Sequence, residues 1–272
     1  MLEAEHTGLA AYYLRGEEQE RLAKDAPGVL EFERTKEIVS RRLPDPPALV
    51  ADIGGGPGRY TQWLAELGYQ VEHRDLMPLH ITQLRAGLAA DALVRSEVGD
   101  ARRLDLADAS VDAVLLLGPL YHLRRPADRI QALREAARIV RPGGPVFAAA
   151  ISRWAPRLDG VLHERLYLQI PAILGAVAEL EQDGWMPPVE PGAFTAYFHR
   201  PDELREEVRA AGLAVADLVT VEGTAYLLAD LAARLANPAE AAVVFDALRA
   251  VERVPELLGV GPHLVATGIR QA

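Results

Sequence analysis

The chain of 272 residues contains no cysteine, and this absence excludes several kinds of chemistry. Without thiols it has no disulfide framework, no thiolate ligands for zinc or an iron–sulfur cluster, and no cysteine nucleophile. No apolar run approaches the roughly 18 residues that span a bilayer. The first residues also lack the basic start and apolar core of a signal peptide. We therefore expect a soluble, cytoplasmic protein without a membrane partner.

Positive charge is also scarce, because 29 Lys and Arg face 39 Asp and Glu, which gives a formal net charge of −10. An acidic chain is poorly suited to hold phosphate backbones through broad electrostatics. We therefore expect no nucleic-acid partner, and the sequence indicates no metal site. The sequence leaves open whether the chain is a monomer or a homodimer.

Short apolar runs alternate with helical patterns from residue 48 onwards, which predicts a sheet with intervening helices. The runs predict strands at 48–53, 69–75, 95–100, 111–118, 145–151, 213–222 and 263–269. Pro78, Pro126 and Pro201 are placed to open helices at their first position. Continuous apolar strands separated by helices are typical of a parallel sheet that is covered on both faces.

Three of these helices have a predicted buried face, assigned from apolar residues spaced at helical intervals. For the helix opened by Pro78, this face consists of Ile81, Leu84 and Leu88. For the helix after the first strand, this face consists of Tyr60, Trp63, Leu64 and Leu67. For the helix opened by Pro126, it consists of Ile130, Leu133, Ala137 and Val140.

The chain divides into four parts by pattern. Residues 1–47 are predicted to form an N-terminal helical cap with amphipathic segments at 1–25 and 30–43, ended by a proline-rich stretch. Residues 48–151 form the core, and 201–272 complete its sheet. Residues 152–200 break the alternation and are rich in aromatic residues and proline, so we interpret them as an inserted lid.

The sharpest chemical signal is a glycine-rich loop, Asp52-Ile-Gly54-Gly55-Gly56-Pro57-Gly58, between the first strand and the first helix. Glycines there allow a tight turn and a close approach of the backbone to a ligand. Asp75 ends the second strand, where a carboxylate can accept both hydroxyls of a ribose. Asp100 follows the third strand at the same edge of the sheet, where it can accept from an exocyclic amine. Such an edge is where open α/β sheets bind ligands.

The order of motifs VADIGGGPGRY, HRDLMP, VGDARRL, VDAVLLLGPLYHL and RIVRPGG resembles that of class I S-adenosylmethionine (SAM)-dependent methyltransferases over residues 48–151. The resemblance implies a Rossmann-like, seven-stranded, mostly parallel sheet whose last strand is antiparallel. It implies SAM as the cofactor, with the methionine part over Asp52 and the glycines, the ribose on Asp75 and the adenine beside Asp100. The implied cofactor-binding set is Asp52, Gly54, Gly55, Gly56, Asp75, Leu76, Asp100, Ala101, Leu117 and Gly118.

Three residues are candidates for the catalytic side of the site. Tyr121 and His122 follow the central strand, where the resemblance places the transferred methyl group. His122 is a candidate general base, because an unperturbed imidazole has a pKa of about 6.5. Tyr13 lies on the N-terminal segment, which in this family often folds over the cofactor. Arg21 and Arg34 are weaker candidates for binding a carboxylate, and His199 is one for touching substrate from the lid.

The sequence thus predicts a SAM-dependent methyltransferase that transfers a methyl group to an oxygen, nitrogen or carbon atom of a small metabolite. Three other interpretations stay open. The protein could be an enzyme that uses SAM for another reaction, such as cyclisation; a SAM-binding module without turnover; or an NAD-dependent dehydrogenase. Against a dehydrogenase, the sequence has no Tyr-x-x-x-Lys pair, since lysine occurs only at positions 24 and 36.

Overall fold

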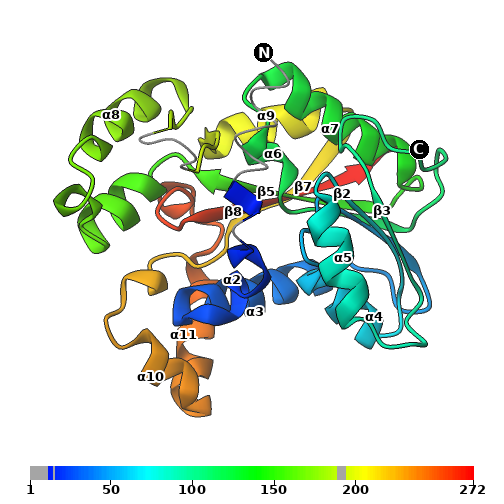
Figure 1. Cartoon of the computed structure of the whole chain (residues 1–272), viewed down its shortest axis with the longest axis horizontal. Coiled ribbons are helices and arrows are strands. Elements are labelled where there is room, and N and C mark those ends of the chain that lie inside the picture. Colours follow the sequence, from blue (N-terminus) through cyan, green and yellow to red (C-terminus); the bar gives the residue numbers. More distant parts are fainter. Residues whose placement is uncertain (1–11, 15, 189–193) are drawn as a thin grey trace.

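The computed structural model describes residues 12–14, 16–188 and 194–272, and its centre is one twisted sheet (Figure 1). The strands are β1 (Leu49–Ile53), β2 (Gln70–Asp75), β3 (Val94–Val98), β4 (Ala113–Leu116), β5 (Pro145–Ser152), β6 (Phe198–His199), β7 (Leu213–Thr220) and β8 (His263–Arg270). Every predicted strand is present, with ends that differ by a few residues.

The main path of the sheet has seven strands in the order β3-β2-β1-β4-β5-β8-β7. Neighbours from β3 to β5 run parallel, whereas β8 is antiparallel to both β5 and β7. The predicted mostly parallel sheet with an antiparallel last strand is therefore confirmed. The structure adds the two-residue β6, which pairs in parallel with the end of β5.

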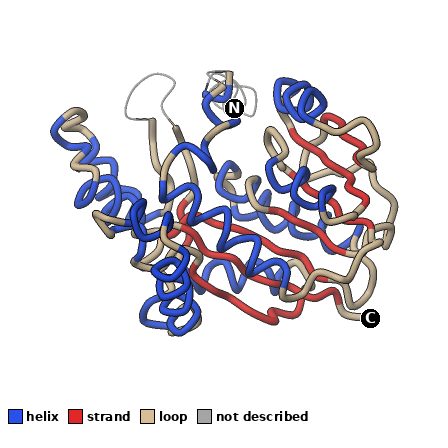
Figure 2. The backbone as a smooth tube through the Cα atoms, turned by 90° about the horizontal axis from the view of Figure 1, so that it is seen from below, coloured by secondary structure: helices blue, strands red, loops and turns tan. Residues whose placement is uncertain are grey.

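Helices cover both faces of the sheet because the side chains of each strand alternate between its two faces (Figure 2). On one face, Ala51 and Leu116 pack with α7 (Pro126–Ile139) and α9 (Pro201–Ala210). On the other face, Val50 and Leu115 pack with α3 (Ala26–Ser40) and α4 (Arg59–Glu66). In addition, α5 (Pro78–Gly87) lies against β2 and β3. Pro78, Pro126 and Pro201 each open their helix, as predicted.

The predicted buried faces of two helices need correction. Leu67 follows the end of α4 and is 48% exposed. In α7 the prediction is confirmed for Leu133 and Val140, which are fully buried, but Ile130 and Ala137 are only partly buried. The other buried residues of this helix are Arg129, Ala132, Ala136 and Ile139. The reason is that Arg129 is buried in an ion pair with Glu207 of α9, so a charged residue occupies the inner face.

The N-terminal part contains η1 (Glu17–Gln19), α2 (Arg21–Lys24) and α3. The predicted start of α3 at residue 30 is wrong, because the Asp25 side chain accepts from the Gly28 N–H and caps the helix before Ala26. Residues 1–11 of the predicted helical cap lie outside the described residues.

The segment after β5 folds into η2 (Pro156–His163), η3 (Leu166–Leu168) and α8 (Ile173–Asp183). It has its own apolar cluster, in which Val177 and Leu180 of α8 pack with Phe198. After β7 come η4 (Ala225–Leu227), α10 (Leu231–Ala236), α11 (Pro238–Val251) and η5 (Pro255–Leu257). Among the described residues, no helix combines the length and apolarity needed to cross a membrane.

Candidate functional site at the carboxyl edge of the sheet

A pocket opens at the carboxyl ends of β1, β2 and β4, beside the short helix α6 (Pro119–His122). It encloses about 1080 Å³ with its open mouth included. All the predicted site residues line it: Tyr13, Asp52, Gly54, Gly55, Gly56, Asp75, Leu76, Asp100, Ala101, Leu117, Gly118, Tyr121 and His122. The topology thus brings residues that span more than a hundred positions of the chain to one cavity.

The glycine loop needs glycine for steric reasons. Gly54 has a φ of +67°, and a Cβ on it would lie 2.4 Å from Cγ of Pro119. A Cβ on Gly55 would lie 2.5 Å from a carboxylate oxygen of Asp52. Side chains are therefore excluded on both sides of the turn, which leaves bare backbone at the pocket wall.

Asp52 is fully buried, and its carboxylate packs against Gly55 of the glycine loop. One oxygen accepts from the Thr61 hydroxyl at 2.6 Å, whereas the other has no hydrogen-bond partner among the described groups. Burial raises the pKa of Asp52 above its ordinary value, since a charged carboxylate is poorly solvated there. Asp52 thus links the loop to α4.

His73 of β2 does not line the pocket but supports the glycine loop from the interior, a role that the sequence reasoning missed. Its Nε2 lies 3.1 Å from the carbonyl oxygen of Gly56, and its Nδ1 lies 3.0 Å from Oγ of Ser96. The ring is fully buried, and burial lowers its pKa. A neutral imidazole that donates from Nε2 and accepts at Nδ1 satisfies both contacts. The only signal for this role in the sequence was the histidine itself, which lies in a segment predicted to be a strand of the sheet.

Asp75 stands at the end of β2 with its carboxylate directed toward the glycine loop. It accepts from the backbone N–H groups of Gly56 at 2.9 Å and Met77 at 2.8 Å, and lies 2.8 Å from Nδ1 of His80. Although burial opposes ionisation, the His80 and backbone hydrogen bonds hold the pKa of Asp75 below its ordinary value. The pocket therefore presents a preformed negative charge here.

Asp100 follows β3 and forms an ion pair with Arg102 at 2.6 Å. Both side chains line the same part of the pocket as Ala101 and Leu76. Leu76 directly follows Asp75, lines the pocket and is 37% exposed, so it offers an apolar group at the pocket surface.

Aromatic and imidazole rings crowd the side of the pocket nearest β4. The Tyr13 hydroxyl lies 2.7 Å from Nε2 of His122, although the two residues are 109 positions apart. Burial lowers the pKa of His122 to about 4 and raises that of Tyr13 well above 10. At neutral pH the pair is therefore an uncharged imidazole and a protonated phenol. Tyr121 and Phe194 add ring contacts with His122 at centroid distances of 4.6 and 5.9 Å.

Of the weaker candidates, only Arg21 lines the pocket. Arg34 is fully buried elsewhere and pairs with Glu252 and Glu37, both at 2.6 Å. His199 is fully buried against Glu207 at 3.1 Å and does not line the pocket. Their placement indicates structural ion pairs rather than contact with a ligand in this pocket.

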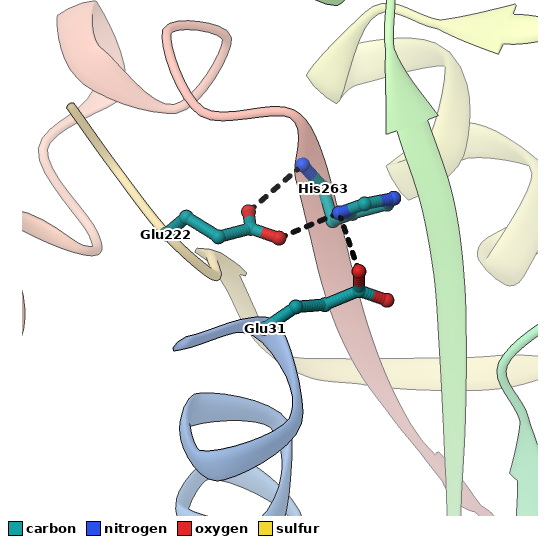
Figure 3. A group of neighbouring side chains, drawn as sticks. All are labelled: Glu31, Glu222 and His263. Carbon is teal, nitrogen blue, oxygen red and sulfur yellow. Dashed lines mark hydrogen bonds and ion pairs between the residues drawn. The ribbon is translucent and has the colours of Figure 1, made fainter. Parts of the chain in front are cut away.

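The charged side chains of Glu31, Glu222 and His263 form a group that joins three segments distant in the sequence (Figure 3). Arg21 pairs with Glu31 at 2.6 Å, and His263 lies 2.6 Å from Glu222 and 3.9 Å from Glu31. Burial works against a charged imidazole, but Glu31 and Glu222 outweigh it and raise the pKa of His263 to about 9. A protonated His263 and Arg21 together neutralise the two carboxylates. We therefore interpret this group as an ion-pair network that anchors α2 to the start of β8.

Comparison with known proteins agrees with this geometry. A methyltransferase-domain family model matches residues 51–148. An uncharacterised methyltransferase of Mycobacterium bovis is 37% identical over 108 residues, which are 40% of this chain and 42% of that protein. The chain thus spans less than half of that relative. A demethylmenaquinone methyltransferase of Deinococcus radiodurans is 33% identical over 178 residues, 61% of this chain and 68% of that protein.

A solved structure supports the fold over almost the whole chain. It is a 1,6-didemethyltoxoflavin-N1-methyltransferase of Burkholderia thailandensis with S-adenosylhomocysteine (SAH) bound. The TM-score is 0.57 at 18% identity, covering 99% of this chain and 88% of that one. By the extended match to the Deinococcus protein and by its fold, this chain belongs to the class I SAM-dependent methyltransferases, the family that uses SAM as its cofactor.

Proposed function

We propose that this protein transfers a methyl group from SAM to a small-molecule acceptor. The observation that carries the proposal is that the glycine loop, the Asp75 and Asp100 carboxylates and the Tyr13–His122 pair line one pocket. Bound SAM supplies a methyl group activated by a sulfonium, and the protein supplies binding and orientation.

The pocket residues fit an adenosyl cofactor. Bare backbone at Gly54 and Gly55 permits close approach of a ligand. Asp75 is held ionised at the strand end, where it can accept from two ribose hydroxyls. Asp100 offers a carboxylate to an exocyclic amine, with Leu76 and Ala101 as apolar surfaces for a flat base.

The acceptor side of the pocket suits a flat, largely apolar molecule. Rings of Tyr13, Tyr121 and His122 line it, and Phe194 packs on His122. Such rings favour stacked or edge-to-face partners. The Deinococcus relative is named for demethylmenaquinone, itself a ring compound. We propose an aromatic or quinone-like acceptor, with oxygen, nitrogen and carbon as the candidate nucleophilic atoms.

The Tyr13–His122 pair is the proposed route for a proton of the acceptor. Tyr13 stays protonated and His122 stays neutral at neutral pH. In the tautomer that carries its proton on Nδ1, Nε2 of His122 accepts the hydrogen bond of the Tyr13 hydroxyl. As an acceptor hydroxyl or amine loses its proton to Oη of Tyr13, the phenolic proton can pass to Nε2 of His122. Tyr121 packs against His122 and limits the tilt of its ring.

Titration calorimetry with SAM, SAH and NAD tests the cofactor assignment. We expect binding of SAM and SAH in the micromolar range, about −8 kcal/mol, and no measurable binding of NAD. Binding of NAD without binding of SAM would contradict the proposal.

Formation of SAH separates methyl transfer from the other uses of SAM. When the protein is incubated with SAM and a panel of quinols, phenols and heteroaromatic amines, we expect SAH to accumulate in step with a methylated product. Conversion of an acceptor without formation of SAH would instead favour another SAM-using reaction, such as cyclisation. Binding of SAM without conversion of any acceptor would favour a SAM-binding module.

A His122→Ala variant is expected to lose about tenfold in turnover while its SAM affinity changes less than twofold. Loss of one hydrogen-bonding partner at the reacting group costs about 1.4 kcal/mol. His122 contacts Tyr13 rather than the Asp75 side of the pocket, so the cofactor subsite keeps its hydrogen bonds. Rates of SAH formation under saturating SAM measure the effect, and an unchanged rate would remove His122 from the chemistry.

A further inference from the structure

Among the residues that the structure describes, three arginines line the pocket, and two of them have acidic partners. Arg21 pairs with Glu18 at 2.8 Å and with Glu31 at 2.6 Å. Arg102 pairs with Asp100 at 2.6 Å. The third, Arg59, forms no ion pair or hydrogen bond with any residue that the structure describes. Its charge is therefore available to something else in the pocket.

Arg59 is held in place without being neutralised. Its guanidinium carbon lies 4.9 Å from the centroid of the Phe32 ring, and the ammonium of Lys36 lies 4.5 Å from the same centroid. Its Nε is buried and has no hydrogen-bond partner among the described groups. An unsatisfied buried donor on a charged group costs free energy, which a bound anion would recover.

From this arrangement we propose that Arg59 binds an anionic group, a carboxylate or a phosphate, of a ligand in the pocket. The guanidinium is planar and presents parallel N–H groups that match such an oxyanion. Its stacking on Phe32 fixes the plane of this fork before the ligand arrives, which lowers the entropic cost of binding. The inference rests on the proposed function, because it concerns a ligand of the same pocket.

Two ligands can supply the anion. Arg59 directly follows Gly58 of the glycine loop, so the carboxylate at the methionine end of the cofactor is one source. An acidic group on the acceptor is the other source. The two sources of the anion are distinguishable, because replacing Arg59 weakens the binding of the cofactor in one case and the binding of the acceptor in the other.

The test is calorimetry on an Arg59→Met variant of the full chain. The probes are SAH, 5′-methylthioadenosine, which lacks the methionine carboxylate, and benzoate and inorganic phosphate added to SAH-saturated protein. If the anion belongs to the cofactor, the variant binds SAH about 30-fold more weakly, the scale of a lost charge-assisted pair, and binds methylthioadenosine normally. If it belongs to the acceptor, SAH binding is unchanged, and benzoate or phosphate binds the wild type but not the variant.

Two further variants serve as controls. Lys36→Met removes the other cation that faces Phe32, and because Lys36 does not line the pocket we expect wild-type affinity for every probe. Arg59→Lys keeps the charge and is expected to recover part of the lost affinity. Circular dichroism and thermal unfolding confirm that each variant is folded.

The inference fails if Arg59→Met binds SAH as well as the wild type does and neither benzoate nor phosphate shows binding that depends on Arg59. The proposed function fails separately, if the wild-type protein binds neither SAH nor methylthioadenosine. In that case benzoate and phosphate are titrated into the protein alone, and dependence on Arg59 still decides the inference.

Discussion

An Asp75→Ala variant is expected to bind SAM about 100-fold more weakly than the wild-type protein, a loss of about 2.7 kcal/mol. Two hydroxyls that donate to a carboxylate form charge-assisted hydrogen bonds, and alanine accepts neither. Asp75 also accepts from the N–H groups of Gly56 and Met77, so its removal loosens the glycine loop as well. Titration calorimetry with SAM and SAH measures the change.

The control for this experiment is Asp91→Ala. Asp91 lies in the exposed turn before β3, and its removal changes the net charge by the same amount without touching the pocket. Affinity should stay at the wild-type value in this variant. Equal SAM affinity in Asp75→Ala and wild type would remove Asp75 from the cofactor site, provided that thermal unfolding shows both proteins folded at the temperature of the titration.

The sheet was predictable because its strands are short apolar runs with turn-forming residues between them. Pro78, Pro126 and Pro201 marked the start of their helices for a local reason, since proline fits the first position of a helix and not its interior. The missed start of α3 was also local, because Asp25 and Pro27 carried the signal of a capped helix start.

The predicted site residues lie close together because of the strand order of the sheet, which brings the carboxyl ends of parallel strands to one edge. Asp75 and Asp100 follow neighbouring parallel strands, and parallel strands bring their carboxyl ends to one edge. Tyr13 reaches the same pocket from 109 positions before His122. The resemblance to the family predicted this placement, whereas the helical pattern of the N-terminal segment alone did not indicate it. The function of these residues toward SAM stays a prediction until ligand binding is measured.

Buried charges are what the hydrophobic pattern could not predict. Arg34, His73 and Arg129 have polar side chains, so a hydrophobic pattern does not assign them to the core. In the structure, however, each of these side chains is at most 1% exposed. Each has hydrogen-bonding partners that are distant in the sequence, as with Arg34 and Val221. The partly wrong face predicted for α7 is the clearest consequence, and it leads to a test of Arg129.

An Arg129→Met variant is expected to lower the free energy of unfolding by about 3–5 kcal/mol, the cost of breaking one side of a buried ion pair. The guanidinium donates to Glu207 at 2.6 Å and to the carbonyl oxygens of Leu123 and Arg124 at 2.9 and 2.7 Å. It also lies 3.6 Å from the centroid of the Tyr197 ring. Methionine fills similar space but leaves the Glu207 carboxylate without its main cation. Urea unfolding followed by circular dichroism measures the change.

Arg134→Met is the matched control, because Arg134 lies on the same helix but is exposed. Among the described residues it donates only to the Ala210 carbonyl oxygen, at 3.3 Å. Its effect should stay within about 0.5 kcal/mol. If the loss in Arg129→Met arises from an uncompensated Glu207 charge, adding Glu207→Gln restores part of the stability, so the double variant is less destabilised than the sum of the single ones. A loss below about 1 kcal/mol in Arg129→Met would show that α7 gains little from its buried arginine, and strict additivity would place the cost in lost packing instead.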